Sequence, residues 1–113
     1  DALDEKLRLY MMFVEDELVG FFVYCFQYSH YANYLADIFT LKKFRRKGYA
    51  RSMMEKYTEI SRAEKTKNNI ALSSTHDTNI VSQKFHEKCG FKMIGKLDKL
   101  HYGKDELFYA YDL

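Results

Sequence analysis

The chain has 113 residues, of which 47% are apolar and 30% are charged. This length supports one hydrophobic core, and the composition is that of a globular protein and not of a disordered chain. We therefore expect a single domain over residues 1–113. The net charge of +2 is too small to indicate nucleic-acid binding, which needs many clustered phosphate contacts.

No segment of the sequence has the pattern of a membrane span, a signal peptide or a metal site. The longest apolar run, Leu18–Phe26, contains a glycine and is too short to cross a bilayer. The polar, acidic start does not resemble a signal peptide, and it lacks an initiator Met, so we expect the chain to begin inside a longer product. Cys25 and Cys89 cannot form a disulfide framework or a four-thiolate zinc site. These features predict a cytoplasmic protein with no membrane contact and no metal.

The first half of the chain has the period of β-strands and then of a helix. Apolar residues alternate from Leu7 to Phe13, acidic residues follow, and Leu18–Phe26 is apolar on both faces, which predicts a hairpin. The aromatic stretch Tyr31–Leu41 predicts a third strand. After a basic run, apolar residues recur at helical spacing and predict a helix of about four turns: Ala50, Met53, Met54, Tyr57 and Ile60.

The second half repeats the alternation of strand and helix. Asn68-Asn69 predicts a turn, and residues 70–75 read as a short buried strand. Asp77 or Thr78 is expected to cap a helix from Asn79 to about Cys89, which Gly90 would close in a left-handed conformation.

Two final strands are predicted at Phe91–Leu97 and Glu106–Leu113, so the order is β-β-β-α-β-α-β-β. Strands joined by a helical crossover lie parallel and hairpin strands lie antiparallel. The fold class is therefore α/β (α+β), with a mixed, mostly antiparallel sheet and helices packed on it.

The segment Arg45–Ala50 lies between a predicted strand and the start of a predicted helix. The first amides of a helix have no intrahelical acceptor, and the helix dipole favours negative charge at that end. Gly48 and Ala50 leave the backbone accessible. The turn is therefore a candidate phosphate site, although a basic turn of this kind can equally be a solvated surface loop.

Two motifs in order resemble the GNAT (GCN5-related N-acetyltransferase) superfamily. The turn reads Arg45-x-x-Gly48-x-Ala50, like the family's Arg/Gln-x-x-Gly-x-Gly/Ala. The second motif, Asn79-x-x-Ser82-x-x-Phe85-His86-x-x-x-Gly90-Phe91, is similar to a block that usually has tyrosine at the His86 position. The resemblance covers the chain from about Leu7 to its end.

The resemblance implies where coenzyme A binds. In the family, the strand before the turn and the strand after the helix splay apart, and the pantetheine arm enters the gap and bonds strand backbone. The turn gives backbone donors to the pyrophosphate, while exposed basic side chains hold the nucleotide end. The residues expected to bind acetyl-CoA or coenzyme A are Phe39, Thr40, Leu41, Arg45, Arg46, Lys47, Gly48, Tyr49, Ala50, Arg51, Asn79 and Ser82.

The second predicted helix carries a candidate for acid catalysis. Asn79, Ser82 and His86 share one face, beside an apolar stripe expected to pack, formed by Val81, Phe85 and Cys89. By resemblance, Asn79 contacts pantetheine and His86 takes the place of the tyrosine that protonates the departing thiolate. Histidine can donate a proton near neutrality. The alternative is a histidine on a half-exposed helix face with no chemical role.

The general base is not identified by the sequence. Ala36 occupies the position where many family members have a glutamate. Asp37 is the next carboxylate, but adjacent strand residues point to opposite faces, which favours a structural role. An ordered water chain, His76, Tyr34 or Tyr31 are other candidates.

The remaining aromatic, histidine and cysteine residues are better explained as structure. Most of the ten Tyr and nine Phe follow the strand period and belong to the core, so a stacking platform is confined to Tyr28, Tyr31 and Tyr34. His30 and His101 lie in predicted loops without metal-ligand spacing. The apolar stripe explains Cys89 better than nucleophilic catalysis does.

The sequence thus predicts an N-acetyltransferase that moves an acetyl group from acetyl-CoA directly to a primary amine. Positioning and backbone dipoles would supply the catalysis. The alternative is an acyl-CoA-binding regulatory module without turnover, which Ala36 and His86 favour. A weaker reading is a nucleic-acid-binding domain that uses the cluster Lys42–Arg51.

The family usually has a first strand and two helices ahead of the matching part, and this chain lacks them. We expect either a fragment of a longer enzyme or a minimal form that borrows cover from a second subunit. The sheet face left exposed predicts association, for example as a homodimer.

Overall fold

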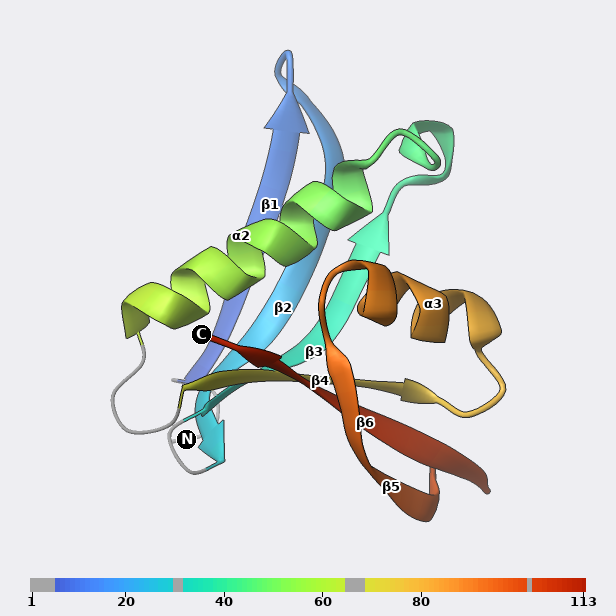
Figure 1. Ribbon diagram of the computed structural model, residues 1–113. Coiled ribbons are helices and arrows are strands. Elements are labelled where there is room, and N and C mark those ends of the chain that lie inside the picture. The colour runs from blue at the N-terminus through green and yellow to red at the C-terminus, as the bar shows by residue number, and fades with distance from the viewer. Residues whose placement is uncertain (1–5, 30–31, 65–68, 102) are drawn as a thin grey trace.

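The computed structural model describes residues 6–29, 32–64, 69–101 and 103–113 (Figure 1). Within these ranges, the strands form a sheet of order β1-β2-β3-β4-β6-β5, and the predicted order of strands and helices is confirmed. The strands are β1 (Leu7–Val14), β2 (Glu17–Ser29), β3 (Ala32–Thr40), β4 (Ile70–His76), β5 (Lys92–His101) and β6 (Lys104–Asp112). The helical segments are η1 (Lys42–Phe44), α2 (Tyr49–Glu64) and α3 (Ile80–Lys88).

The sheet is mixed, as predicted, because one of its strand pairs is parallel. β3 and β4 are joined by the α2 crossover and pair in parallel only at Asn33 with Ala71 and at Tyr34 with Leu72. The other pairings are antiparallel. Beyond Tyr34, β3 pairs with β2 alone, while β4 continues along β6 to its end at His76. The two central strands therefore splay apart toward their carboxyl ends.

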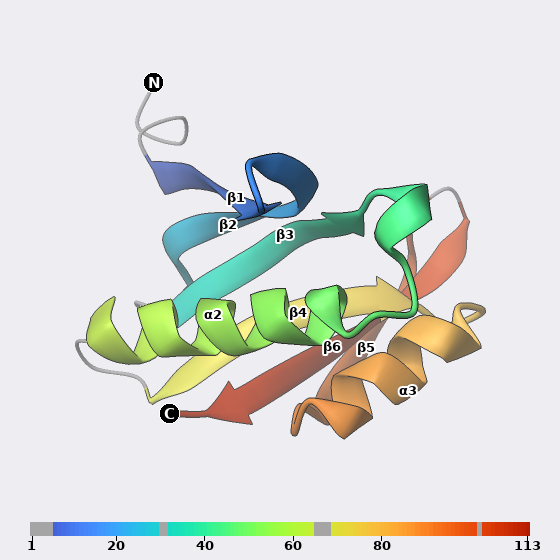
Figure 2. The same cartoon turned by 90° about the horizontal axis from the view of Figure 1, so that it is seen from above.

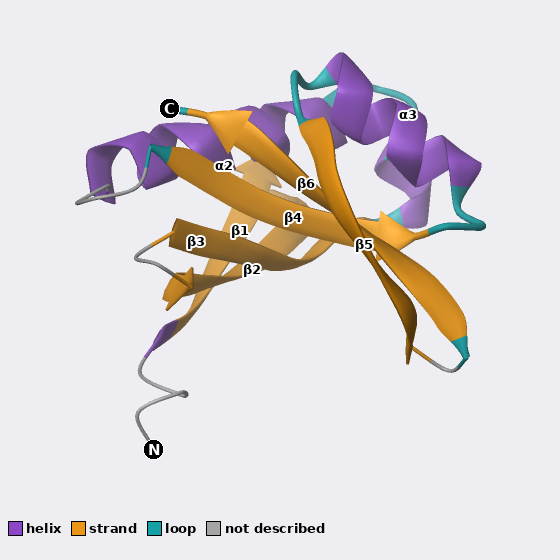
Figure 3. Ribbon diagram, turned by 60° about the horizontal axis from the view of Figure 1, so that its bottom comes forward, coloured by secondary structure: helices purple, strands orange, loops and turns teal. Residues whose placement is uncertain are grey.

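Both helices lie on one side of the sheet, and the core fills the space between (Figure 3). Met53, Met54 and Tyr57 of α2 are fully buried against β2 residues such as Phe22. The Tyr57 hydroxyl donates to the backbone carbonyl of Leu72 at 2.7 Å. Burial raises the pKa of Tyr57, so the phenol stays a neutral donor. The helix is thereby packed against β2 and bonded to β4.

A polar network fixes the carboxyl end of α2 to the strands. The amide nitrogen of Asn33 donates to Ser61 Oγ at 3.2 Å and to Glu64 Oε1 at 3.1 Å. Asn33 Oδ1 accepts from the backbone N–H of Gln27 at 3.0 Å. Glu64 also pairs with Arg8 of β1. Asn33 is buried, and both the oxygen and the nitrogen of its side-chain amide are hydrogen-bonded. The network therefore orients α2 and directs its amino end toward the place where β3 and β4 separate.

The ends of α3 show one correction and one confirmation. The predicted cap at Asp77 or Thr78 is wrong, because the side chain of Asn79 accepts from the backbone N–H of Ser82 at 3.0 Å and the helix begins at Ile80. Gly90 does follow the helix in the left-handed region, with φ of 89°. Two backbone hydrogen bonds of the kind that ends many helices follow. The N–H of Gly90 donates to the Glu87 carbonyl, and the N–H of Phe91 donates to the His86 carbonyl.

The sheet face opposite the helices is apolar along β1. Leu7, Leu9, Met11 and Phe13 alternate with inward residues and are 45% to 60% exposed. The exposed face predicted from the sequence is therefore present in the described part of the chain. The association that it suggests stays a prediction.

Gly20 lies where β2 is in close contact with both β3 and α2, and it offers a test of the packing. A Cβ atom there would lie 2.4 Å from the Phe39 carbonyl oxygen and 2.8 Å from Met53 Cε. We expect Gly20→Ala to lower the free energy of unfolding by about 1–3 kcal/mol. Urea denaturation measures this, with Gly95→Ala as the control, because a Cβ at Gly95 meets nothing within 4 Å. Equal stability of the two variants would contradict this packing.

Candidate functional site

The connection from β3 to α2 is a compact turn that exposes backbone amides. Arg46 and Gly48 both adopt positive φ, of 64° and 84°. Left-handed residues within a turn direct successive N–H groups into a concavity that suits an anion. Gly48 adopts this conformation without the cost that a side chain would add, and a Cβ there would meet nothing within 4 Å. The turn therefore has a concave shape that suits an anion, and the space in front of Gly48 is open to a ligand.

The amino end of α2 continues this array of donors. The N–H of Ser52 donates to the Gly48 carbonyl at 3.1 Å, the first bond of helical spacing. The amides of Tyr49, Ala50 and Arg51 precede it and have no intrahelical acceptor. The first turn carries no acidic side chain. Together with the helix dipole, these amides form a site that favours phosphate.

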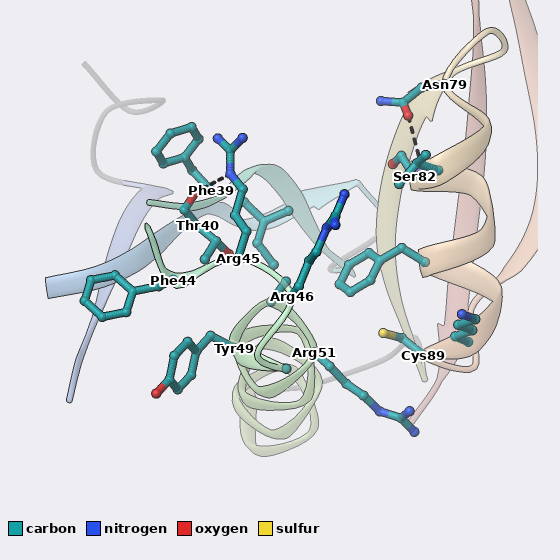
Figure 4. Close-up of a pocket in the computed structure, with 16 residues that line it drawn as sticks. Phe39, Thr40, Phe44, Arg45, Arg46, Tyr49, Arg51, Asn79, Ser82 and Cys89 are labelled. Carbon is teal, nitrogen blue, oxygen red and sulfur yellow. Dashed lines mark hydrogen bonds between the residues drawn. The ribbon is translucent and has the colours of Figure 1, made fainter. Parts of the chain in front are cut away.

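A cavity of about 750 Å³ opens between this helix end and α3 (Figure 4). In Figure 2 the amino end of α2 and the helix α3 lie side by side. The structure gathers every residue of the predicted cofactor set around the cavity except Leu41 and Lys47. The sequence missed six further lining residues, which are Ile38, Phe44, Val81, Phe85, Lys88 and Cys89. The apolar ones were assigned to the core because periodicity does not show which side of an apolar stripe faces a ligand.

The basic side chains of the turn differ in what they do. Arg45 Nε donates to the Thr40 carbonyl at 3.0 Å, so this side chain braces the turn (Figure 4). Arg46 extends toward α3 in the same view. Arg51 points toward Cys89, and its Nε lies 3.4 Å from Glu55 Oε1 in an exposed pair. Arg46 and Arg51 therefore remain the residues best placed to meet a phosphorylated ligand in the cavity.

Helix α3 brings its apolar stripe to the large cavity in addition to Asn79 and Ser82. Phe85 and Cys89 pack against the core, as predicted, and also line the large cavity, whereas Val81 is 81% exposed at its edge. His86 is instead only 3% exposed, which rules out a half-exposed position. The helix has turned its imidazole toward the sheet because Tyr109 and Ser73 offer a stacking surface and a hydrogen bond there.

The hydrogen bonds of His86 define its tautomer. Nδ1 lies 2.8 Å from the backbone carbonyl oxygen of Ser82, which can only accept, so Nδ1 carries the proton. Nε2 then accepts from the Ser73 hydroxyl at 2.7 Å. Burial lowers the pKa of His86, and the bond to Ser82 raises it by less. The ring is therefore neutral and engaged at both nitrogens, and its role as an acid stays a prediction.

The gap between the splayed strands forms a second cavity of about 170 Å³. Residues 35–38 of β3 line one side, and the other side is formed by Ser73, Ser74, Ser82 and His86. Ile38 and Ser82 also line the large cavity, so the two spaces adjoin. The two consecutive serines that follow the apolar start of β4 were the sequence signal for this lining.

A β-bulge changes the predicted orientation of Asp37. Tyr24 pairs with Leu35 and Val23 pairs with Asp37, which leaves Ala36 as an extra residue. Leu35 and Ile38 accordingly both reach the core although they are three residues apart. Ala36 and Asp37 are both exposed and line the small cavity. The expectation that Asp37 faces away from the Ala36 side is therefore wrong.

The other candidates for a base lie on the open face of the sheet or outside the described residues. The Tyr34 hydroxyl is 2.5 Å from Ser74 Oγ, and His76 Nδ1 is 3.2 Å from Glu106 Oε1. Tyr28 packs its ring against Tyr34 at 5.2 Å. His30, Tyr31 and the side chain of His101 lie outside the described part of the chain. In the ranges that are described, no three potential ligands are placed to hold a metal ion.

Comparison with known proteins gives the family. The sequence matches the model of the acetyltransferase (GNAT) family over residues 1–91. The chain therefore belongs to this family, and the resemblance of its two motifs is confirmed. No curated protein matches the sequence. No helix of the described residues is long and apolar enough to cross a bilayer, and the cytoplasmic location stays a prediction.

Solved structures share the fold at low sequence identity. A GNAT family acetyltransferase from Elizabethkingia anophelis with acetyl-CoA bound aligns with a TM-score of 0.86 and 13% identity, over 99% of this chain and 80% of that one. An acetyltransferase from Bacillus subtilis in complex with CoA aligns with a TM-score of 0.80 and 18% identity, over 96% of this chain and 78% of that one. A spermidine N-acetyltransferase chimera from Vibrio cholerae aligns with a TM-score of 0.84 and 17% identity, over 96% of this chain and 68% of that one. These likenesses show the fold and do not name the acceptor.

The buried neutral state of His86 predicts a pH dependence of stability. Its folded pKa lies below the ordinary value of about 6.5, so the unfolded chain binds the proton more readily. Stability is retained above that value and lost as the pH falls below it, by at most about 1.4 kcal/mol per pH unit for one proton. Urea denaturation between neutral and mildly acidic pH should show a smaller decrease for His86→Gln than for the wild type. An identical decrease would show that His86 does not cause the effect.

Proposed function

We propose that this chain is an N-acetyltransferase domain that transfers an acetyl group directly from acetyl-CoA to a primary amine. The observation that supports this most is the adjoining pair of cavities. One lies at an amide-rich helix end, the other lies in the gap between splayed strands, and both contact Ile38 and Ser82. A phosphorylated carrier can occupy the first while its acyl end reaches the second.

Coenzyme A fits the donors present. The pyrophosphate would accept hydrogen bonds from backbone amides between Gly48 and Arg51, and Arg46 would add charge. The pantetheine arm would lie along Phe39 and Thr40 as an added strand, since β3 has no partner on this side there. The Leu41 amide already donates to the Val19 carbonyl at 2.9 Å, so we do not assign it to the ligand.

Asn79 and Ser82 would meet the same arm from α3. The cap bond uses only the Oδ1 atom of Asn79, so its amide N–H groups are left to donate to a ligand carbonyl. Ser82 lines both cavities and marks the passage between them. Acetyl-CoA would supply the acyl group as a thioester, and the chain would hold its carbonyl beside unpaired strand amides that stabilise developing negative charge.

We assign the general base to Asp37. An amine with a pKa near ~10 must lose a proton before it can attack, whereas a thiolate with a pKa near ~8.5 leaves without much assistance. The bulge presents the Asp37 carboxylate at the small cavity, on the face that is not covered by helices. A base is thus placed where an incoming amine would lose its proton, and no acid is required from His86.

An acyl-CoA-binding module without turnover remains the second candidate. Ala36 at the family's glutamate position and the fully engaged His86 favour it. The two functions differ in one measurement. Coenzyme A binding together with thiol release in the presence of amines supports the enzyme, while binding without thiol release across amine classes supports the module.

The first test concerns the phosphate site. Gly48→Glu should abolish coenzyme A binding in calorimetry, because it places a carboxylate among the amides and also strains a residue at φ of 84°. Gly103→Glu is the matched control, since Gly103 has φ of 77°, is equally open and lies away from the cavities. Unchanged affinity in the Gly48 variant would refute the placement of the cofactor.

The second test concerns the base. Asp37→Asn should lower kcat for amine acetylation by about 100-fold or more, because the amide cannot take the proton. Coenzyme A affinity should not change, since Asp37 does not line the large cavity. Asp112→Asn, an exposed carboxylate at the end of β6, controls for the loss of charge. A kcat equal to that of the wild type would remove Asp37 from the mechanism.

A further inference from the structure

Ser74 of β4 lies on the open face of the sheet and lines the small cavity. The residues of this strand alternate, with Ala71 and Ser73 buried on the helix side, so the side chain of Ser74 points the other way. Ser74 is half-buried, and the exposed Asp37 lines the same cavity. The opening that leads to the proposed base therefore leads to Ser74 as well.

A β-bulge in β3 brings Tyr34 and Asp37 to this face together. Residues three apart in a regular strand point to opposite faces, and the extra residue of the bulge brings them to the same one. Asp37 pairs with Val23, which pairs with Leu9, and Leu9 is 60% exposed on the open face. Tyr34 reaches Ser74 on the same face. Three polar side chains from the two sides of the gap are thus gathered at one opening.

The hydroxyl of Tyr34 holds the hydroxyl of Ser74 in place. The Oη atom of Tyr34 lies 2.5 Å from Ser74 Oγ. The phenol is the more acidic of the two groups, and burial raises the pKa of Tyr34, so the phenol is a neutral donor and Ser74 accepts. Ser74 Oγ keeps a second lone pair for a ligand. A serine side chain otherwise turns among three rotamers, so this bond gives the lone pair a defined direction.

The reacting amine needs a second acceptor besides the base. An ammonium group carries three N–H donors, and in the proposed reaction Asp37 removes one proton. The neutral amine that results has one lone pair, which must point at the thioester carbonyl in order to attack. A hydrogen bond from one of the remaining N–H groups to a fixed oxygen holds the nitrogen in this orientation.

We infer that Ser74 Oγ accepts a hydrogen bond from the reacting amine and that Tyr34 positions Ser74 for this contact. The inference rests on the proposed acetyl transfer and names two residues of its acceptor site. Asp37 and Ser74 would bind the nitrogen from β3 and β4, the two strands that border the gap. The amine would thus be held across the opening on the open face, while the carrier arrives from the helix side.

The variant Ser74→Ala tests the contact in turnover. It removes one hydrogen bond to the nitrogen, so kcat/KM for butylamine should fall by about 10-fold or more, and Ser74→Thr, which keeps a hydroxyl, should restore most of it. Coenzyme A affinity should not change, because Ser74 does not line the large cavity. Thr78→Ala removes an exposed hydroxyl that lines neither cavity and is the control. Equal kcat/KM for Ser74→Ala and the wild type would overturn the inference.

A double-mutant cycle tests the role of Tyr34. Tyr34→Phe keeps the ring and removes the hydroxyl, and kcat/KM for butylamine should fall by about 3- to 10-fold. In the Ser74→Ala background the same change should have no further effect, because Tyr34 acts through Ser74. A purely structural role would lower kcat/KM by the same factor in both backgrounds, and that result would overturn the assignment of Tyr34.

Binding separates this inference from the proposed function. The ammonium form of butylamine has three N–H groups, whereas that of N,N-dimethylbutylamine has one, which Asp37 would take. Each amine is titrated into protein saturated with coenzyme A, and binding is followed by NMR. Butylamine should bind about 10-fold more weakly to Ser74→Ala than to the wild type, while the dimethyl compound binds both equally.

This pattern would support the contact even if no amine were acetylated, since the titration does not depend on turnover. An equal loss of affinity for the two amines would indicate a structural effect of the substitution and would overturn the inference. Equal binding of butylamine to the two proteins would also overturn it, whether or not acetylation occurs.

Discussion

The separation of β3 from β4 after two residue pairs is the constraint on which the rest of the structure depends. It opens a space inside the sheet that side chains fill only in part. It also leaves the backbone groups on the β4 side of β3 without a strand partner beyond Tyr34. The α2 crossover that joins the two strands begins beside this opening. The amide-rich turn and the gap are therefore consequences of one topology, since the same connection that makes the strands parallel also brings a helix end to their point of divergence.

The helix layer keeps that separation in place. Tyr57 bonds the backbone of β4 while Met53 and Met54 pack against β2. Asn33 of β3 bonds Glu64 at the far end of α2 and also Gln27 of β2. On the other side of the gap, His86 joins α3 to β4 through Ser73 and stacks on Tyr109 of β6. A histidine in this position acts as a packing and hydrogen-bonding element.

The two faces of the sheet have different roles under the proposed function. The helix side holds the amides and the basic side chains that suit a phosphorylated carrier. The open side holds carboxylates, with Asp37 on β3 and Glu106 on β6, together with aromatic rings. Opposite charges on opposite faces direct an anionic donor and a cationic acceptor to meet at the gap between them.

The sequence by itself determined the order of the elements, the mixed sheet, the turn proposed to bind phosphate and the family, because periodicity, glycine placement and motif spacing are local properties of the chain. Only the tertiary structure decided which face of α3 meets the cavity, because an apolar stripe packs equally well against a core or a ligand. It also decided the orientation of Asp37, since the bulge at Ala36 appears only in the pairing with β2. The ion-pair contact of Glu106 with His76 was decided likewise, because His76 lies on another strand and no local pattern could place it beside the carboxylate.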